Sequence, residues 1–283
     1  MSTQNKFFDL SHLGLLSIAG PDAKKFLQGQ LTCHLDEVTS TQSRLGAHCN
    51  PQGRVISLFR LFMHHDHYYL QMPRELISVA TKALQKYAVF FKVKLTDVSN
   101  EFKQSGYIGS ELANMPQMMN EQIVKDNLVI MRLPGTPARY QFIGEMTHTI
   151  FSDINFWKSM DIANHIPAIY PETSEKFLPH DLDLPKLNAV SFDKGCYTGQ
   201  EIIARMQYRG KLKNHLYQAK VNTILAPTRG ADIYLADKSA GHIVDFCQIS
   251  YNHYELLVIA HENDVETDKL TLDPEKKYSL EFL

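Results

Sequence analysis

The stretch KGCYTGQE, which begins at Lys194, holds the side chains best suited to chemistry in this chain of 283 residues. Cys196 lies within it, and Thr198 and Glu201 have the T-x-x-E spacing of a capping box, so a helix is predicted to begin there. The positive end of a helix stabilises a thiolate, and the charges of Lys194 and Arg205 would add to this effect. Two interpretations stay open: Cys196 is a reactive thiolate, or it is the small side chain that fits a Gly-Cys-Tyr turn.

The other three cysteines, Cys33, Cys49 and Cys247, show no spacing that forms a zinc knuckle or a redox pair. A large chain in a reducing compartment requires no disulfide framework. We therefore expect these three side chains to be small hydrophobic members of the core.

A basic stretch follows the cysteine motif. Residues 205–220 carry basic and aromatic side chains and no acidic one: Arg205, Tyr208, Arg209, Lys211, Lys213, Tyr217 and Lys220. Such a patch can contact a polyanion. The formal net charge of the chain is −2, so the protein as a whole has no positive electrostatic potential that would attract one. The alternative interpretation is solvated charge at a domain junction.

The segment MHHDHYY gathers His64, His65, Asp66 and His67. The flanking runs are typical of paired strands, and consecutive side chains on a strand point to opposite faces. We expect a hairpin tip that faces water, and no metal site.

The elements that must position these residues fall into three parts. In residues 1–100 the sequence predicts strands, a hairpin whose turn is Asn50-Pro51-Gln52-Gly53, and an amphipathic helix over 73–88. Together these elements are typical of an α+β unit of split ferredoxin-like type. Residues 101–207 predict a second α+β part with the strand candidates LVIMRL and RYQFIGE. Residues 208–283 hold short alternating runs separated by turns, which favour a C-terminal antiparallel β-barrel.

Trp157 is the only tryptophan, and it lies on a helix candidate of the second part before a loop-rich stretch at 171–193. It is either a core side chain or a ring that stacks on a flat heterocycle at a cavity wall.

No apolar run approaches the roughly 18 residues of a transmembrane helix, and the N-terminal sequence lacks the pattern of a signal peptide. We expect no membrane contact, and the cytoplasm is the predicted compartment.

KGCYTGQE and the following ARMQYRG resemble the signature of the YgfZ family of folate-binding proteins. Relatives of that family are the glycine-cleavage T-protein, an aminomethyltransferase, and the mitochondrial iron–sulfur assembly factors. Further blocks match in order: GPDAKKFLQGQLT, HCNPQGRVISLFRLF, LQKYAVFFKV and IPAIYPETSEKFLPHDLDL. The resemblance is close before the β-rich end and loose within it. It implies a three-domain, ring-like α+β fold of the T-protein type around a central channel that binds tetrahydrofolate or a one-carbon derivative.

The resemblance also implies the site. It makes Cys196 the functional thiol and Trp157 a ring that packs on the folate, and Leu13 occupies the position of a second such tryptophan. Residues of the motif and of the helix after it complete the implied cofactor site: Lys194, Gly195, Tyr197, Gln200, Glu201 and Arg205.

Two departures from the relatives concern chemistry. Where relatives have the acidic residue of an EAG turn that clamps the pterin, this chain has Ala163-Asn164-His165. Where the T-protein has an acidic pair after the hairpin, this chain has Ser57 and Leu58, so no carboxylate is available there to steer a substrate amine.

The function implied is that of a folate-binding accessory protein that supports the maintenance of iron–sulfur enzymes, including those that modify tRNA. Cys196 would serve as a thiolate or as a transient cluster ligand. Catalytic turnover is not expected, and any turnover would be that of a tetrahydrofolate-dependent transferase. The alternatives are an aminomethyltransferase-like one-carbon transferase and a direct tRNA-binding module, with weak tRNA contact through Arg209, Lys211 and Lys213.

Overall fold

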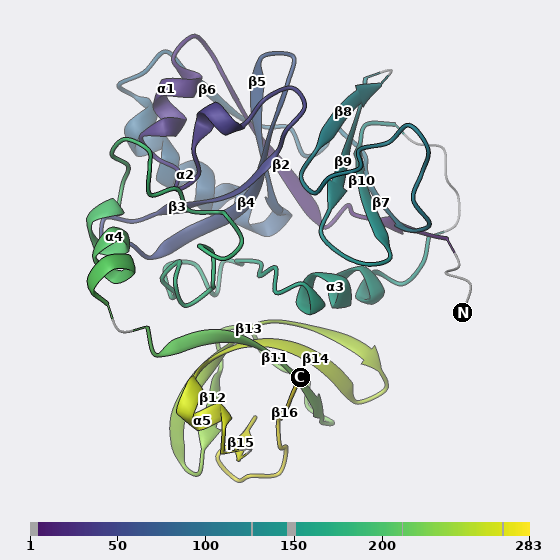
Figure 1. Ribbon diagram of the computed structural model, residues 1–283, viewed down its shortest axis with the longest axis vertical. Coiled ribbons are helices and arrows are strands. Elements are labelled where there is room, and N and C mark those ends of the chain that lie inside the picture. Colours follow the sequence, from purple (N-terminus) through teal and green to yellow (C-terminus); the bar gives the residue numbers. More distant parts are fainter. Residues whose placement is uncertain (1–4, 126, 146–150, 211, 268) are drawn as a thin grey trace.

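The computed structural model describes residues 5–125, 127–145, 151–210, 212–267 and 269–283. Its strands form three antiparallel sheets of five, six and five strands. Two sheets lie side by side in the upper half of Figure 1, and the third, formed by the C-terminal residues, lies below them. The chain therefore has the mixed α/β content, dominated by sheets, that the sequence predicts.

The first sheet has the strand order β3-β4-β5-β2-β6. Its strands are β2 (Leu13–Ala19), β3 (Arg44–Cys49), β4 (Val55–His64), β5 (His67–Pro73) and β6 (Lys94–Asp97). The helices that accompany it are α1 (Ala23–Gln28), η1 (Leu35–Glu37), η2 (Arg74–Leu76) and α2 (Ile77–Ala88). Buried residues of α1 and α2 share one hydrophobic cluster with one face of this sheet, because apolar side chains recur at helical spacing along α2.

The predicted hairpin between β3 and β4 is confirmed. Gly53 adopts φ +77° and its N–H donates to the carbonyl oxygen of Asn50 at 2.9 Å, so the turn closes where the glycine permits a left-handed conformation.

The second sheet has the order β1-β7-β10-β9-β8. Its strands are β1 (Lys6–Asp9), β7 (Gln104–Gly109), β8 (Gln122–Lys125), β9 (Leu128–Leu133) and β10 (Ala138–Ile143). A second hydrophobic cluster joins this sheet to the first sheet and to α3 (Ile154–Ala163). Because β1 pairs with β7, the first hundred residues contribute strands to both sheets, and the domain boundaries near residues 100 and 207 stay a prediction.

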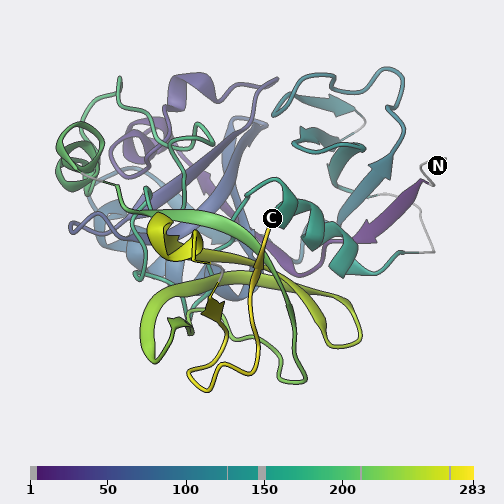
Figure 2. The same cartoon turned by 60° about the horizontal axis from the view of Figure 1, so that its bottom comes forward.

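The C-terminal sheet has the order β15-β12-β13-β14-β11-β16. Its strands are β11 (Asn214–Asn222), β12 (Asp232–Leu235), β13 (Lys238–Ser250), β14 (His253–His261), β15 (Leu270–Thr271) and β16 (Glu281–Phe282). The short helix α5 (Glu262–Val265) follows β14. Irregular register along β13 bends the sheet, which Figure 2 shows as a curled half-barrel. The predicted closed barrel is not clearly formed, because each edge strand contributes only two residues.

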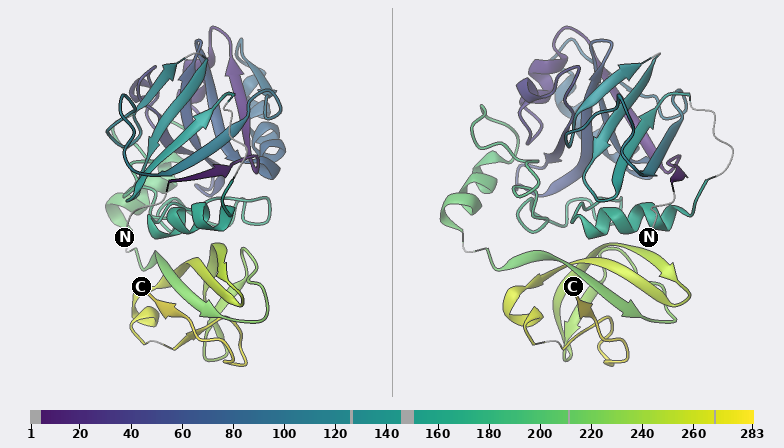
Figure 3. Two further views of the ribbon diagram at one scale, coloured as in Figure 1. Left: turned by 90° about the vertical axis from the view of Figure 1, so that its right-hand side faces the viewer. Right: turned by 45° about the vertical axis from the view of Figure 1, so that its right-hand side comes forward.

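The C-terminal sheet packs against α3, which lies between it and the two upper sheets in both views of Figure 3. A buried polar cluster adds to this contact. Arg229 Nε lies 2.8 Å from Asp245 Oδ1, and the Tyr170 hydroxyl donates to Asp245 Oδ2 at 3.2 Å. Burial raises the pKa of Asp245 even though Arg229 opposes this shift.

The predicted hairpin tip at His65 and Asp66 is confirmed, since both residues have positive φ between β4 and β5. The expectation that the whole tip faces water is wrong for His64. Its side chain is buried because the tip lies against Asn127, whose Oδ1 is 3.3 Å from His64 Nε2.

No helix among the described residues is long and apolar enough to cross a membrane.

Candidate functional site

The KGCYTGQE motif forms a loop, and its first residue is hydrogen-bonded to backbone carbonyl groups at the end of α1 and just after it. The Lys194 ammonium donates to the carbonyl oxygens of Gln28, Leu31 and Cys33 at 2.8, 2.6 and 3.0 Å. An ammonium has three N–H donors, and these bonds use all of them. The predicted contact of Lys194 with a cofactor would require one of these bonds to break, and it stays a prediction.

The other end of the loop lies on the same stretch of chain. The Thr198 N–H donates to the Gly29 carbonyl at 3.2 Å, and the Thr198 hydroxyl lies 3.3 Å from Gln30 Oε1. Residues 28–32 belong to one of the sequence blocks that carry the family resemblance, and Cys33 follows it directly. The tertiary structure therefore brings this block and the cysteine motif together.

A third block, the hairpin at Asn50 and Gly53, also contacts the motif. Gly199 adopts φ +84°, and a Cβ added there would lie 2.6 Å from the Asn50 carbonyl oxygen. A Cβ added to Gly53 would lie 3.1 Å from Ile202 Cβ. Both glycines thus permit an approach that a larger residue would obstruct.

The predicted capping box is wrong. Helix α4 (Gln200–Arg209) begins at Gln200, and Gly199 occupies its N-cap position. The left-handed turn at Gly199 separates Thr198 from the first turn of the helix, so the Thr198 hydroxyl contacts Gln30 instead. Cys196 lies outside the helix N-terminus, on the far side of this turn.

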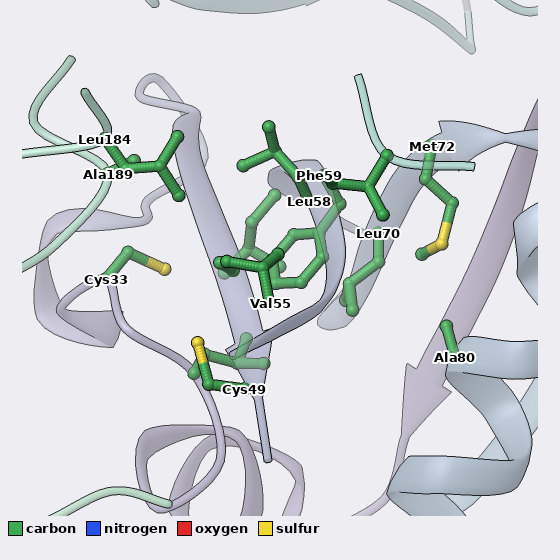
Figure 4. Close-up of a cluster of buried hydrophobic side chains, with 14 of the residues drawn as sticks. Cys33, Cys49, Val55, Leu58, Phe59, Leu70, Met72, Ala80, Leu184 and Ala189 are labelled. Atoms are coloured by element: carbon green, nitrogen blue, oxygen red, sulfur yellow. The ribbon is translucent and has the colours of Figure 1, made fainter. Parts of the chain in front are cut away.

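Exposure distinguishes the four cysteines. Cys196 is exposed, and Cys33, Cys49 and Cys247 are buried, which confirms the prediction that three of the four are core side chains. Burial raises the pKa of Cys33 to about 11 and that of Cys247 to about 12. Figure 4 shows Cys33 and Cys49 within the hydrophobic cluster that also holds Val55.

The remaining predicted motif residues differ in exposure. Tyr197 is buried, and its ring centroid lies 4.9 Å from the Lys194 ammonium nitrogen. Glu201 and Arg205 lie on the exposed side of α4, where they line a shallow groove of about 620 Å³ together with Tyr208 and Arg209. Lys211, which the sequence placed in the same basic patch, lies outside the described residues.

Leu13 lines a different depression, a cavity of about 770 Å³ at one end of the first two sheets. Its lining also includes carboxylates, cations, amides, hydroxyls and two aromatic rings: Asp9, Ser11, Arg74, Ser99, Asn100, Glu101, Phe102, Lys103, Gln104, Ser105, Asn127, Glu145 and Phe151, with the backbone of Gly144. The sequence did not single out these residues, because segments distant along the chain contribute them.

Trp157 lies near this region but is not among the described residues that line the cavity. Its side chain is 3% exposed and packs in the cluster to which Leu13 also belongs. A Cβ added to Gly106 would lie 2.4 Å from the Trp157 ring, and the Arg139 guanidinium carbon lies 4.4 Å from the ring centroid. Trp157 is therefore a core side chain here, and its stacking on a folate stays a prediction that requires the ring to become exposed.

The cavity lining, rather than Trp157, fits the chemistry of a folate. Its volume lies within the range of small-molecule sites. Asp9 and Glu101 offer carboxylate oxygens to ring N–H groups, and Arg74 and Lys103 offer cations to ligand carboxylates. No residue of the KGCYTGQE motif lines this cavity. The motif packs instead on the first hydrophobic cluster, through Tyr197. Helix α4, which follows the motif, lies well apart from α3, which carries Trp157 (Figure 1).

The structure also shows where the positions that differ from the relatives lie. Ser57 and Leu58 on β4 are both buried, and the Ser57 hydroxyl has no hydrogen-bond partner among the described residues. Helix α3 ends at Ala163, and His165 follows with φ +51°.

Comparison with known proteins agrees with this architecture. A family model described as the GCVT N-terminal domain matches residues 1–131. The crystal structure of the glycine cleavage system aminomethyltransferase T from Bartonella henselae superposes with a TM-score of 0.75 at 14% identity, over 100% of this chain and 85% of the other. The chain is thus a protein of the aminomethyltransferase T fold.

Curated relatives define the family more narrowly. The tRNA-modifying protein YgfZ of Colwellia psychrerythraea is 32% identical over 226 residues, which cover 74% of this chain and 69% of the relative. The protein of the same name from Cronobacter sakazakii is 30% identical over 92% of this chain and 86% of its own. This chain belongs to the YgfZ family.

Proposed function

We propose that this protein is a folate-binding accessory protein that supports tRNA modification and the iron–sulfur enzymes that perform it, and that it acts through the thiol of Cys196. The observation that carries the proposal is the exposed Cys196 in a loop fastened at both ends. Family membership supports it, because the relatives carry the name tRNA-modifying protein.

The 770 Å³ cavity is the proposed folate site. Asp9 and Glu101 would accept hydrogen bonds from the pterin, Phe102 and Leu13 would pack on its ring, and Arg74 would pair with a glutamate carboxylate. A bound tetrahydrofolate supplies a carrier of one-carbon units. The three sheets would correspond to the three parts of the ring-like arrangement that the family resemblance implies.

The proposed act of Cys196 is that of a thiolate toward an oxidised or one-carbon-bearing species. Ligation of a cluster is the weaker alternative, because a single cysteine does not hold an iron–sulfur cluster and the other three thiols are buried.

The test of the thiol is complementation of a strain that lacks its own family member and shows a defect in tRNA thiomethylation. Cys196→Ala should abolish rescue while the variant melts at the wild-type temperature, since an exposed side chain contributes little to stability. A folded Cys196→Ala variant that rescues fully would refute the role of the thiol.

The test of the cofactor is calorimetric titration with tetrahydrofolate. Arg74→Gln and Phe102→Ala should each weaken binding by about tenfold or more, the equivalent of roughly 1.4 kcal/mol. Arg54→Gln is the matched control, because Arg54 lies outside the cavity lining. Absence of binding to the wild-type protein would remove the cofactor from the proposed function.

A one-carbon transfer reaction like that of the T-protein is the alternative enzyme activity. Ser57 and Leu58 provide no carboxylate on β4, so an assay for tetrahydrofolate-dependent glycine cleavage should detect no turnover.

Direct contact with tRNA is a second candidate function. The observation that favours it is Tyr208, whose side chain is 70% exposed in the groove between Arg205 and Arg209. Salt-sensitive tRNA binding that is lost in an Arg205→Gln/Arg209→Gln variant would support it, and binding unchanged in that variant would exclude this surface.

A further inference from the structure

We propose that Lys194 is a positioning residue whose ammonium fastens the loop that carries Cys196 to the chain at the end of α1. This inference rests on the proposed function, in which Cys196 is the functional thiol. It assigns Lys194 to the geometry of the protein rather than to a ligand.

The geometry of the acceptors carries the inference. The last carbonyl groups of a helix have no partner within the helix, and Gln28 ends α1. The Gln28 carbonyl and those of Leu31 and Cys33 converge on the Lys194 nitrogen within 3.0 Å. A single cation therefore satisfies three backbone groups that belong to a segment more than 160 residues away in sequence.

The burial of Lys194 makes this attachment specific. The residue is 7% exposed. Burial of a charged ammonium is costly unless hydrogen bonds within the protein replace those that it makes with water. The Tyr197 ring provides a further contact to the cation. Burial lowers the pKa of Lys194 to about 8, so the side chain still carries its proton at neutral pH.

The tip of the loop, in contrast, is free. A Cβ added to Gly195 would meet no described atom within 4 Å, and Cys196 is exposed. Thr198 fastens the far end through its N–H and its hydroxyl. The Ser191 N–H also donates to the Thr32 carbonyl at 2.8 Å. Loss of the Lys194 ammonium would therefore release the attachment nearest to Cys196 on this side and lengthen the segment that is free to move.

The experiment attaches a nitroxide label to Cys196 and records its electron paramagnetic resonance spectrum. The other three cysteines are buried, so a single site is labelled. In Lys194→Met, the rotational correlation time of the label should fall by roughly threefold or more, because a tethered loop becomes a mobile one. Lys186→Met is the matched control, since Lys186 is a surface lysine that pairs with Asp183, and its label should remain as immobile as in the wild type.

A second labelling site separates the loop from the rest of the protein. A label placed by Lys238→Cys in a Cys196→Ala background reports on the turn between β12 and β13. Lys194→Met should leave its spectrum unchanged, whereas general loosening of the fold would alter both spectra and overturn the specific role.

If Lys194→Met does not fold, the mobility of the label is measured in Lys194→Arg instead. This variant keeps the positive charge, but its planar guanidinium does not direct three donors from one nitrogen. The label should again be more mobile than in the wild type. A label as immobile as in the wild type, in either folded variant, overturns the positioning role.

The complementation assay is a separate measurement. Full rescue by Cys196→Ala would refute the proposed function and leave the spectra unaffected. An immobile label in a folded Lys194 variant would refute the positioning role and leave the requirement for Cys196 unaffected.

Discussion

At the scale of single residues, the environment of each thiol decides its chemistry. Cys33 and Cys49 lie within the core, where burial raises the pKa of both thiols and disfavours the thiolate. Cys196 lies at the tip of a loop that two backbone-anchored residues hold in place. Four identical side chains therefore have different access to solvent.

This difference predicts a thiol count. The native protein should react with one equivalent of a disulfide reagent per chain, and the denatured protein with four, because three thiols become accessible only on unfolding. The Cys196→Ser variant should show no reactive thiol in the native state and three reactive thiols after denaturation. Rapid reaction of more than one thiol in the native wild type would contradict the buried positions of the others.

His48 predicts a dependence of stability on pH. Burial, with a smaller effect from Lys86, lowers the pKa of His48 to about 4. The unfolded chain binds the proton near pH 6.5 but the native state only near pH 4, so stability falls as the pH drops through this interval, by about 3 kcal/mol at pH 4. In His48→Leu, urea unfolding between pH 7 and pH 4 should show a shallower loss of stability.

The exposed His253 provides the control for His48. His253→Leu should leave the slope of stability against pH close to that of the wild type. An equally steep slope in His48→Leu would mean that other groups produce the acid sensitivity.

At the scale of elements, the motif is positioned by close contact with the β3–β4 hairpin. Gly53 and Gly199 face this contact from its two sides, and Ile202 at the start of α4 packs on Gly53. The hairpin, the loop and α4 therefore form one packed unit. Glycine is required where two backbones approach so closely.

This contact predicts opposite outcomes for two glycines of one motif. Gly199→Ala combines a left-handed backbone with a Cβ 2.6 Å from the Asn50 carbonyl, so it should lower the free energy of unfolding by about 2 kcal/mol or more. Gly195→Ala meets no described atom and should stay within about 0.5 kcal/mol of the wild type. Urea denaturation measures both, and equal destabilisation by the two changes would contradict the packing described.

At the scale of the whole molecule, α3 and Tyr170 join the C-terminal sheet to the remainder of the fold, and Tyr170 does so through the Arg229–Asp245 pair. The Arg229 guanidinium carbon lies 3.5 Å from the Tyr170 ring centroid, and Tyr170 precedes the motif on the segment that connects α3 with α4. The C-terminal sheet thus contacts the segment that leads to Cys196.

Arg229→Met tests this connection. Removal of the cation leaves Asp245 buried without its partner, so the free energy of unfolding should fall by about 3 kcal/mol. The Arg229→Met/Asp245→Leu variant should be less destabilised than Arg229→Met alone, because it buries no unpaired charge. Denaturation that gives the reverse order would show that the Arg229–Asp245 pair, which contacts Tyr170, does not stabilise the fold.

The sequence alone predicted the elements that local forces define. Pro51 restricts its own backbone and Gly53 permits a positive φ, so together they determine the hairpin. The apolar spacing along residues 73–88 predicts a helix because one face must be buried, and the structure begins α2 at Ile77 after a short 3-10 turn. The motif and the ordered blocks were sufficient to identify the family, as the relatives confirm.

The tertiary structure decided how the motif residues are used. The contact of Lys194 with Gln28 spans 166 positions, and no local pattern in the sequence predicts it. The family resemblance alone placed Lys194 in a cofactor site, and that placement stays a prediction. Burial of Trp157 likewise depends on Gly106 and Arg139, which distant strands bring to its ring. The motif therefore indicated which of the four thiols is the candidate, and long-range packing determined which residues hold its loop in place.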